Sequence, residues 1–265
     1  MKRVGTVASR ELRSLFVSPV AYVVLTLFAV LGGFFFLSTV LSFNEYLIQL
    51  QQFQVFDELA KLNLNDHVIA PFLSTMSVVL LFLIPGVTMS LFAAEKANGT
   101  DELLLTSPLT IWDIVLGKFL AGAGFVAILV ALVGLFPLLL FLYGDPEVGK
   151  TAAGLIGPLL VGITYVAIGA FASSVTRSQI IAFVLAFVIL LVVWMLSFLA
   201  DLGAAGGAVG ASGALGGTLR WISSADHFEN LVKGLIDTAD LAYFGVMVGS
   251  FLLMTKAAVE SVRWR

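Results

Sequence analysis

Six long apolar stretches constrain this chain more than any other feature of its sequence. They cover residues 20–41, 68–92, 114–143, 152–175, 180–199 and 241–258. A helix of about 20 apolar residues crosses the roughly 30 Å of hydrocarbon in a bilayer. Only 12% of the residues are charged, whereas soluble domains carry about 25%. The sequence therefore predicts an all-α polytopic membrane protein, with six transmembrane helices in one domain that covers residues 1–265.

The positions of lysine and arginine predict how these spans are oriented. With the N-terminus in the cytoplasm, ten of these residues fall on the cytoplasmic side and four on the opposite side. The ten are Lys2, Arg3, Arg10, Arg13, Lys96, Lys118, Arg177, Lys256, Arg263 and Arg265, and the four are Lys61, Lys150, Arg220 and Lys233. This asymmetry follows the positive-inside rule and predicts that both termini are cytoplasmic.

The first segment predicts an amphipathic helix. Residues 1–16 combine basic side chains with an apolar face on a helical repeat. The apolar run that follows is too long for a cleaved signal peptide, so we expect a helix that lies on the membrane surface. An ordinary basic flank to the first span is the alternative.

Two longer segments are expected outside the membrane, on the side away from the termini. Residues 44–67 are polar with apolar side chains at helical spacing, which predicts a partly helical excursion at the interface. Residues 203–217 are rich in Gly, Ala and Ser, which is typical of a flexible tether. A short amphipathic helix is predicted after it, at 221–233. Residues 176–179 predict a tight cytoplasmic hairpin.

A polar island at 92–109 separates the second and third spans. Its charged residues are Glu95, Lys96, Asp101 and Glu102. Asn98-Gly99 predicts a turn, and Thr100 is the expected N-cap of a short helix whose first turn carries acids. Three leucines give this helix an apolar face, and Pro108 ends it. A short amphipathic helix between two spans predicts a docking element for a partner.

The sequence disfavours several kinds of chemistry. Residues 144–151 match the phosphate-binding pattern G-x-x-x-x-G-K-[ST], but a membrane-length helix precedes them. Pro146 lacks an N–H, and Asp145 and Glu147 would repel phosphate. His67 and His227 each follow an aspartate, and we expect loop hydrogen bonds there rather than a metal site. The chain has no cysteine and no catalytic grouping, so it is not expected to be an enzyme by itself.

The spans themselves carry few polar groups. Their central parts hold no ionisable residue, and Lys118 is one of several charged residues near span ends that are expected to snorkel toward water. This pattern argues against a secondary transporter, because ion-coupled carriers place ionisable groups inside the membrane. Small residues at Gly117 and Ala121, and at Ala153 and Gly157, permit close approach of helices.

Three separated motifs point to a known family. The first is Phe92-Ala93-x-Glu95-Lys96-x-x-Gly99-Thr100-x-Glu102-Leu103-Leu104-x-Thr106-Ser107-Pro108. The others are Glu11-Leu12-x-x-x-Phe16-x-Ser18-Pro19-x-Ala21-Tyr22 and His227-Phe228-Glu229-Asn230-x-x-Lys233-Gly234-x-Ile236-Asp237-Thr238-x-Asp240. Together they resemble ABC-2 type (type V exporter-like) ABC transporter permeases, notably the gliding-motility and copper-accessory branch. Ala94 departs from the pattern, since the family commonly has a second acid there.

The resemblance implies roles for three sets of residues. The coupling helix, which docks on the ATPase, would comprise Glu95, Lys96, Gly99, Thr100, Glu102, Leu103, Leu104, Thr106, Ser107 and Pro108. An N-terminal elbow helix would include Arg10, Glu11, Arg13 and Phe16. Re-entrant or interfacial outer helices before the sixth span would present His227, Phe228, Glu229 and Asp237 to a partner.

The resemblance also implies partners and a location. The permease would act with a separate cytoplasmic ABC ATPase subunit and with a second permease copy or paralogue, in a bacterial inner membrane. ATP and Mg would bind to the ATPase, so no cofactor is expected on this chain, and no nucleic acid. A membrane-anchored extracytoplasmic auxiliary protein is a further expected partner.

The predicted function is to couple ATP hydrolysis by the partner to export or mechanotransmission across the membrane. One alternative is a membrane scaffold that recruits extracytoplasmic partners and moves no substrate, since the spans offer few polar groups to line a path. A secondary transporter is a third interpretation. The substrate and the choice between homodimer and heterodimer stay open.

Overall fold

The described part of the chain is helical. The computed structural model describes residues 2–54, 62–100, 109–206, 223–235 and 237–261, and no strand occurs among them. Six of its helices are long and apolar enough to cross a membrane. The expected all-α polytopic membrane fold is therefore confirmed.

The helices follow one another with short connections. In chain order they are α1 (Lys2–Val17), α2 (Pro19–Gln52), the π-helix η1 (Asn65–Ile69), α4 (Ala70–Thr88), α5 (Ser90–Asn98), α7 (Ile111–Tyr143), α8 (Val148–Val175), α9 (Gln179–Gly206), α11 (Ser224–Val232) and α12 (Thr238–Ser261). Only Thr176, Arg177 and Ser178 separate α8 from α9, so the predicted tight hairpin is confirmed.

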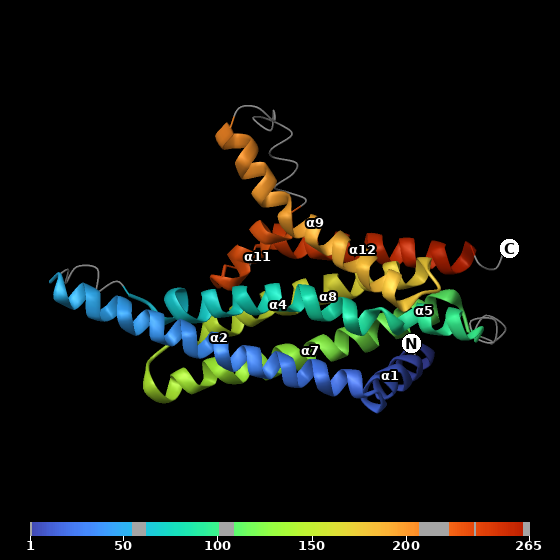
Figure 1. Ribbon diagram of the computed structural model, residues 1–265, viewed down its shortest axis with the longest axis horizontal. Coiled ribbons are helices and arrows are strands. Elements are labelled where there is room, and N and C mark those ends of the chain that lie inside the picture. Colours follow the sequence, from blue (N-terminus) through green and yellow to red (C-terminus); the bar gives the residue numbers. More distant parts are fainter. Residues whose placement is uncertain (1, 55–61, 101–108, 207–222, 236, 262–265) are drawn as a thin grey trace.

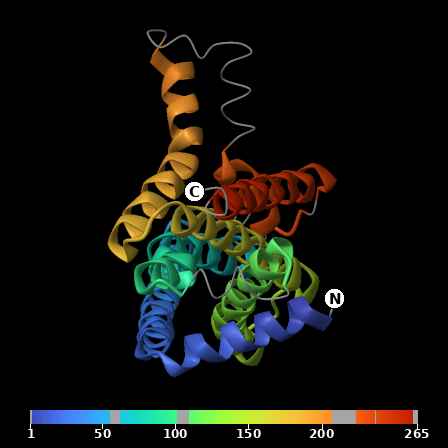
Figure 2. The same ribbon diagram turned by 90° about the vertical axis from the view of Figure 1, so that its right-hand side faces the viewer.

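The long helices lie alongside one another, with α8 at the centre. Helix α8 contacts α4, α7, α9, α11 and α12. Figure 1 shows α1, α5 and the last turns of α12 at one end of the bundle, which we call the termini end, and the tip of α2 at the opposite, far end. Figure 2 shows α1 lying across the bundle, against α7.

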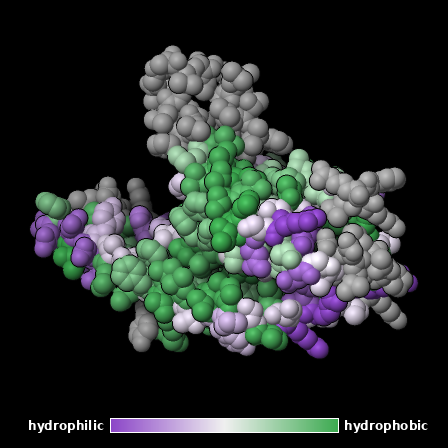
Figure 3. Space-filling model, turned by 45° about the vertical axis from the view of Figure 1, so that its right-hand side comes forward, coloured by the Kyte–Doolittle hydropathy of each residue, from purple (hydrophilic) through white to green (hydrophobic). Residues whose placement is uncertain are grey.

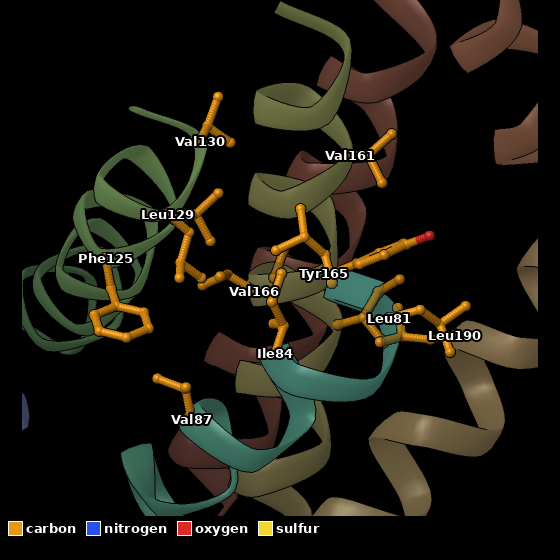
Figure 4. Packing of buried hydrophobic residues seen from close by; sticks show 14 of the residues in the cluster. Leu81, Ile84, Val87, Phe125, Leu129, Val130, Val161, Tyr165, Val166 and Leu190 are labelled. Atoms are coloured by element: carbon orange, nitrogen blue, oxygen red, sulfur yellow. The ribbon is translucent and has the colours of Figure 1, made fainter. Parts of the chain in front are cut away.

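Small residues let the central helices approach closely. A Cβ atom added at Gly122 of α7 would lie 2.6 Å from Val166 of α8, and one added at Gly162 of α8 would lie 2.5 Å from Val126 of α7. Such contacts suit helices in a membrane, where close packing replaces the hydrophobic effect as the force between them. Figure 4 shows Val166 of α8 and Ile84 of α4 in the packed core that these helices form with α7.

The surface of the bundle has the layering that a membrane protein needs. On the face that Figure 3 shows, apolar residues cover the middle of the molecule and hydrophilic residues lie toward its two ends. The first span carries many of the exposed apolar side chains. Only 22% of the residues in its most apolar stretch are buried, whereas 67% are buried in the corresponding stretch of α8. Helix α2 therefore forms part of the apolar surface, whereas α8 forms the core.

The first, second and fifth spans extend well beyond their predicted ends. The first span continues without a break to Gln52, so residues 44–52 belong to α2 rather than to a separate excursion. No glycine or proline interrupts this stretch, and Phe43 and Tyr46 stack on His67 with ring centroids 6.0 and 5.9 Å apart. After only Met89, α5 carries the second span on to Asn98.

The fifth span is also longer than predicted. Helix α9 reaches Gly206, so residues 203–206 of the predicted tether are helical, and 207–217 lie outside the described residues. Alanine is the strongest helix former, which offsets the cost of the glycines here. The amphipathic helix predicted at 221–233 is present as α11, which covers Ser224–Val232.

Candidate functional site

A buried lysine joins three helices at the termini end. Lys118 lies in the second turn of α7, and its side chain is only 2% exposed. Its Nζ donates to Glu95 Oε1 of α5 at 2.7 Å and to Glu11 Oε2 of α1 at 3.3 Å. We call Arg10, Glu11, Glu95 and Lys118 the Lys118 junction. The expectation that Lys118 snorkels toward water is wrong, because two carboxylates from other helices meet it inside the protein.

The charges of the Lys118 junction balance. Arg10 donates to Glu11 at 2.8 Å, so two basic and two acidic side chains alternate along the network. The hydrogen bond to Glu11 raises the pKa of Arg10. The ring of Phe92 lies 5.4 Å from the Lys118 Nζ and adds a cation–π contact. A buried ion network of this kind is costly to break, because removing one member leaves a charge without its partner.

A glycine explains how α1 reaches Lys118. A Cβ atom added at Gly117 would lie 2.5 Å from Val7, so α1 rests directly on the backbone of α7. Leu12 and Phe16 of α1 also pack against the core, and the Phe16 ring lies 5.9 Å from that of Phe125. The apolar face of α1 thus covers α7, and the close approach expected at Gly117 is made with the elbow segment.

The end of α5 is held by α8. The Ser173 hydroxyl accepts from the N–H groups of Phe92 and Ala93 at 3.0 Å and donates to Met89 O at 2.8 Å. Lys96 donates to the carbonyl of Ser174. Helix α5 is therefore held against α8 at both of its ends.

The polar island is described only at its two edges. Gly99 ends α5 in the left-handed conformation with φ 68°, as the predicted turn requires, and the N–H of Thr100 donates to Glu95 O at 3.0 Å. The predicted coupling residues Glu102, Leu103, Leu104, Thr106, Ser107 and Pro108 lie outside the described residues. On the other side, Thr110 and Asp113 form a capping box that starts α7.

The remaining elbow residue faces outward. Arg13 is exposed, and no hydrogen bond or ion pair of its side chain occurs among the described residues. Arg10 is also largely exposed, with 66% of its side chain accessible. Helix α1 therefore presents the basic groups of Arg10 and Arg13 to its surroundings, while Glu11 points inward to Lys118.

In the third sequence motif, residues 227–240, a contact between His227 and Asp240 joins two helices. His227 Nδ1 lies 2.6 Å from Asp240 Oδ1, and its ring stacks on Tyr243 at 4.2 Å between centroids. Asp240 is buried. His227 was expected to act in a local pair with the preceding aspartate, but Asp240 of α12 is the carboxylate that meets its ring. This contact ties α11 to α12.

The other predicted outer residues have separate environments. Phe228 faces α8, where a Cβ atom added at Gly157 would lie 3.1 Å from its ring. Glu229 is exposed and pairs with Lys233 at 2.5 Å. Asp237 accepts from the N–H of Ala239 at 3.2 Å and so caps the first turn of α12. The four residues do not form one cluster.

The turn that resembles a phosphate-binding loop is occupied by the protein itself. The N–H of Glu147 donates to Asn65 Oδ1 at 2.8 Å, and the Asn65 amide donates to Thr151 at 2.9 Å. Lys150 pairs with Glu147 at 3.0 Å. Hydrogen bonds from Lys150 and from Asn63 lower the pKa of Glu147. The turn thus joins α8 to the start of η1.

In the described helices and connections, the histidine and carboxylate side chains form no group of three that would hold a metal ion.

A family model provides the decisive comparison. The model described as "ABC-2 family transporter protein" matches residues 6–263, which is nearly the whole chain. This chain belongs to the ABC-2 family of transporter proteins. The match includes both the Lys118 junction and the His227–Asp240 contact, so both lie within the ABC-2 transmembrane region.

Individual relatives agree with this assignment. The chain is similar to the probable multidrug ABC transporter permease YbhR of Escherichia coli K12 and to its counterpart in Escherichia coli O157:H7, each 29% identical over 150 residues. The aligned part is 56% of this chain and 38% of each relative, so the chain spans well under half the length of these relatives in the alignment. The protein is thus an ABC-2 family transporter protein with six helices that are long and apolar enough to cross a membrane.

Several residues that link helices in this ABC-2 family protein are not evident from its sequence. Lys118 stands out only as a charge near a span end, and nothing in the sequence distinguishes Ser173 or Asn65. Charge near a membrane boundary gives no sign of its partner when that partner lies 107 positions away in the chain, as Glu11 does from Lys118. The sequence signal that could have indicated the contact is the pair Gly117-Lys118, in which a glycine that permits close approach of a helix precedes a lysine in an apolar span.

Proposed function

We propose that this chain is the permease subunit of an ATP-driven transporter, and that it couples ATP hydrolysis in a separate cytoplasmic ATPase to export or mechanotransmission. The Lys118 junction is the observation that carries the proposal. It links α1, α7 and the end of α5, which leads directly into residues 101–108. Membership of the ABC-2 family supports an ATPase partner and a second permease subunit.

In this proposal the coupling element comprises residues 95–98 at the end of α5 and residues 99–108, which begin with the turn at Gly99. Closure of the ATPase dimer on ATP and Mg would push on Thr100 and the leucines that follow. Because Glu95 is held by Lys118 of α7, and Lys96 by α8, the displacement would reach the third and fourth spans directly. The first, second and fifth spans would then move between inward and outward states. No cofactor would bind to the permease itself. Its termini would lie in the cytoplasm of a bacterial cell, as the distribution of lysine and arginine favours.

The finer assignment is to the gliding-motility and copper-accessory branch. Its support is the three sequence motifs described above. An extracytoplasmic auxiliary protein would then contact the outer residues, of which Glu229 is exposed at the surface.

The test is an affinity pull-down of the tagged, detergent-solubilised chain from its native cells, with mass spectrometry. Recovery of a P-loop ATPase that is lost in Leu104→Asp and in Glu102→Arg is the expected result. Leu235→Asp is the matched control, because Leu235 is 62% exposed at a site remote from the polar island. If both island variants retain the ATPase, the coupling-helix assignment is wrong.

A scaffold that moves no substrate is the second candidate. The observation in its favour is the apolar character of the spans, whose buried polar side chains in the described residues are mainly serine and threonine. Recovery of membrane partners without an ATPase in the same pull-down would favour the scaffold over the permease.

A further inference from the structure

A cavity of about 640 Å³ lies between α4, α8, α9 and α11, a volume in the range of small-molecule sites. It starts near the surface at η1, which supplies Asp66, and reaches the middle of α8 at Tyr165. Figure 1 shows α9 leaning away from the bundle beside α11. The cavity lies in this region and belongs to neither the Lys118 junction nor the polar island.

The cavity offers mainly apolar contact. Val161, Phe228 and Trp194 line it from three different helices, and Trp194 is partly accessible, with 39% of its surface exposed. Two of the hydroxyl groups in the lining already have protein partners: Tyr165 is hydrogen-bonded to Ser224, and Ser77 donates to Leu73 O at 2.9 Å. A ligand would therefore place an apolar body here, against a mainly apolar lining.

The charged groups of the cavity stand at its outer part and leave a net negative charge. Glu229 and Lys233 pair at 2.5 Å and cancel. Asp66 is exposed on the π-helix η1, and within the described residues its carboxylate forms no hydrogen bond or ion pair. Its influence on Lys150 is electrostatic only, and Lys150 is paired with Glu147. The lining thus carries one carboxylate that a cation could neutralise.

The aromatic side chains of the cavity also favour a cation. A cation over the face of a tryptophan or phenylalanine ring is attracted by the ring quadrupole, and more strongly where water is excluded. Trp194 and Phe228 line the same cavity as Asp66. π-Helical turns occur frequently at functional sites, and η1 is the segment that brings Asp66 to the cavity.

We propose that this cavity binds a hydrophobic organic monocation, with its apolar body between Trp194, Phe228 and α8 and its charge near Asp66. The proposal does not depend on the ATP-coupled function, because binding requires only this chain.

The test uses two probes of nearly the same shape and opposite charge, tetraphenylphosphonium and tetraphenylborate. Saturable binding to the full chain in lipid nanodiscs is measured by equilibrium dialysis, with empty nanodiscs as the background. The cation should show saturable binding, and the anion should not. Asp66→Asn should weaken cation binding about fivefold, the upper range for an exposed ion pair.

Matched variants separate the cavity from the general surface. Asp145→Asn makes the same charge change on an exposed turn that does not line the cavity, and it should leave binding unchanged. Ser74→Trp fills the cavity from α4 and should abolish binding, whereas Leu142→Trp adds the same ring at a position that is 76% exposed.

The proposal is overturned if neither probe binds saturably, if the anion binds as tightly as the cation, or if Asp66→Asn binds like the wild type. Size-exclusion elution of each variant checks that it folds. Should Ser74→Trp fail to fold, the charge reversal between probes and the Asp66→Asn variant still decide the outcome.

Discussion

Replacing Lys118 by methionine should detach α1 and α5 from α7. Methionine keeps the length of the side chain and removes its charge. The lysine side chain is 2% exposed, and Glu11 and Glu95 are only 15% and 23% exposed, so water cannot fully replace the lost ion pairs. Breaking a buried ion pair by removing one partner costs about 3–5 kcal/mol. We expect the lower end of this range, because Arg10 still pairs with Glu11.

The control is the same substitution at an exposed ion pair. Lys150 and Glu147 are 37% and 54% exposed, so Lys150→Met should lower the free energy of unfolding much less than Lys118→Met does. Adding Glu95→Gln to Lys118→Met should recover part of the loss, since the amide carries no charge that needs a partner.

Two measurements check this prediction. Denaturant titration in mixed micelles gives the change in the free energy of unfolding. The chain has no cysteine, so spin labels at Ser9→Cys and Asn98→Cys report the distance between α1 and α5 without background labelling. Lys118→Met should broaden this distance distribution. If neither the unfolding free energy nor the distance distribution changes, the Lys118 junction does not hold these helices together.

Three further predictions concern other contacts. Gly117→Leu should lower the free energy of unfolding by about 1–3 kcal/mol in the same titration, because the new side chain would clash with α1 and displace it; an unchanged value would contradict the close packing of α1 on α7. Asp240→Asn should lower it by about 1–3 kcal/mol, because it leaves the ring of His227 without its carboxylate; protease cleavage within α11 should then increase. The pKa of Glu147 is lowered in the fold, so its contribution to stability is present above its ordinary pKa of 4.5 and is lost as the pH falls through the lowered value. The difference in thermal midpoint between the wild type and Glu147→Gln should therefore shrink with acidification, and a difference that grows would refute the assignment.

Much of the architecture is a local property of the sequence. The length and apolar composition of each span depend only on neighbouring residues, so six membrane-length helices could be predicted without tertiary information. The turn at Gly99 and the hairpin at 176–178 follow from local chemistry for the same reason. The ends of α2 and α9 were less predictable, because nothing in the sequence stops a helix where it leaves the bilayer.

The contacts between helices were decided by the tertiary structure. The sequence placed Lys118 near a membrane boundary, where snorkelling is common, but only packing shows that α1 crosses Gly117 and brings a carboxylate to it. His227 likewise has an aspartate beside it in the chain, yet its carboxylate partner comes from α12.

The cavity gives the clearest example of a feature that only the tertiary structure determines. Its lining comes from η1, α4, α8, α9 and α11, and no single segment of the sequence contains the combination of Asp66 with Trp194 and Phe228. Apolar length is summed over adjacent residues and can be read along the chain. Partners for buried charges and the shape of a cavity depend on which helix faces meet, and that is determined by packing across the whole bundle.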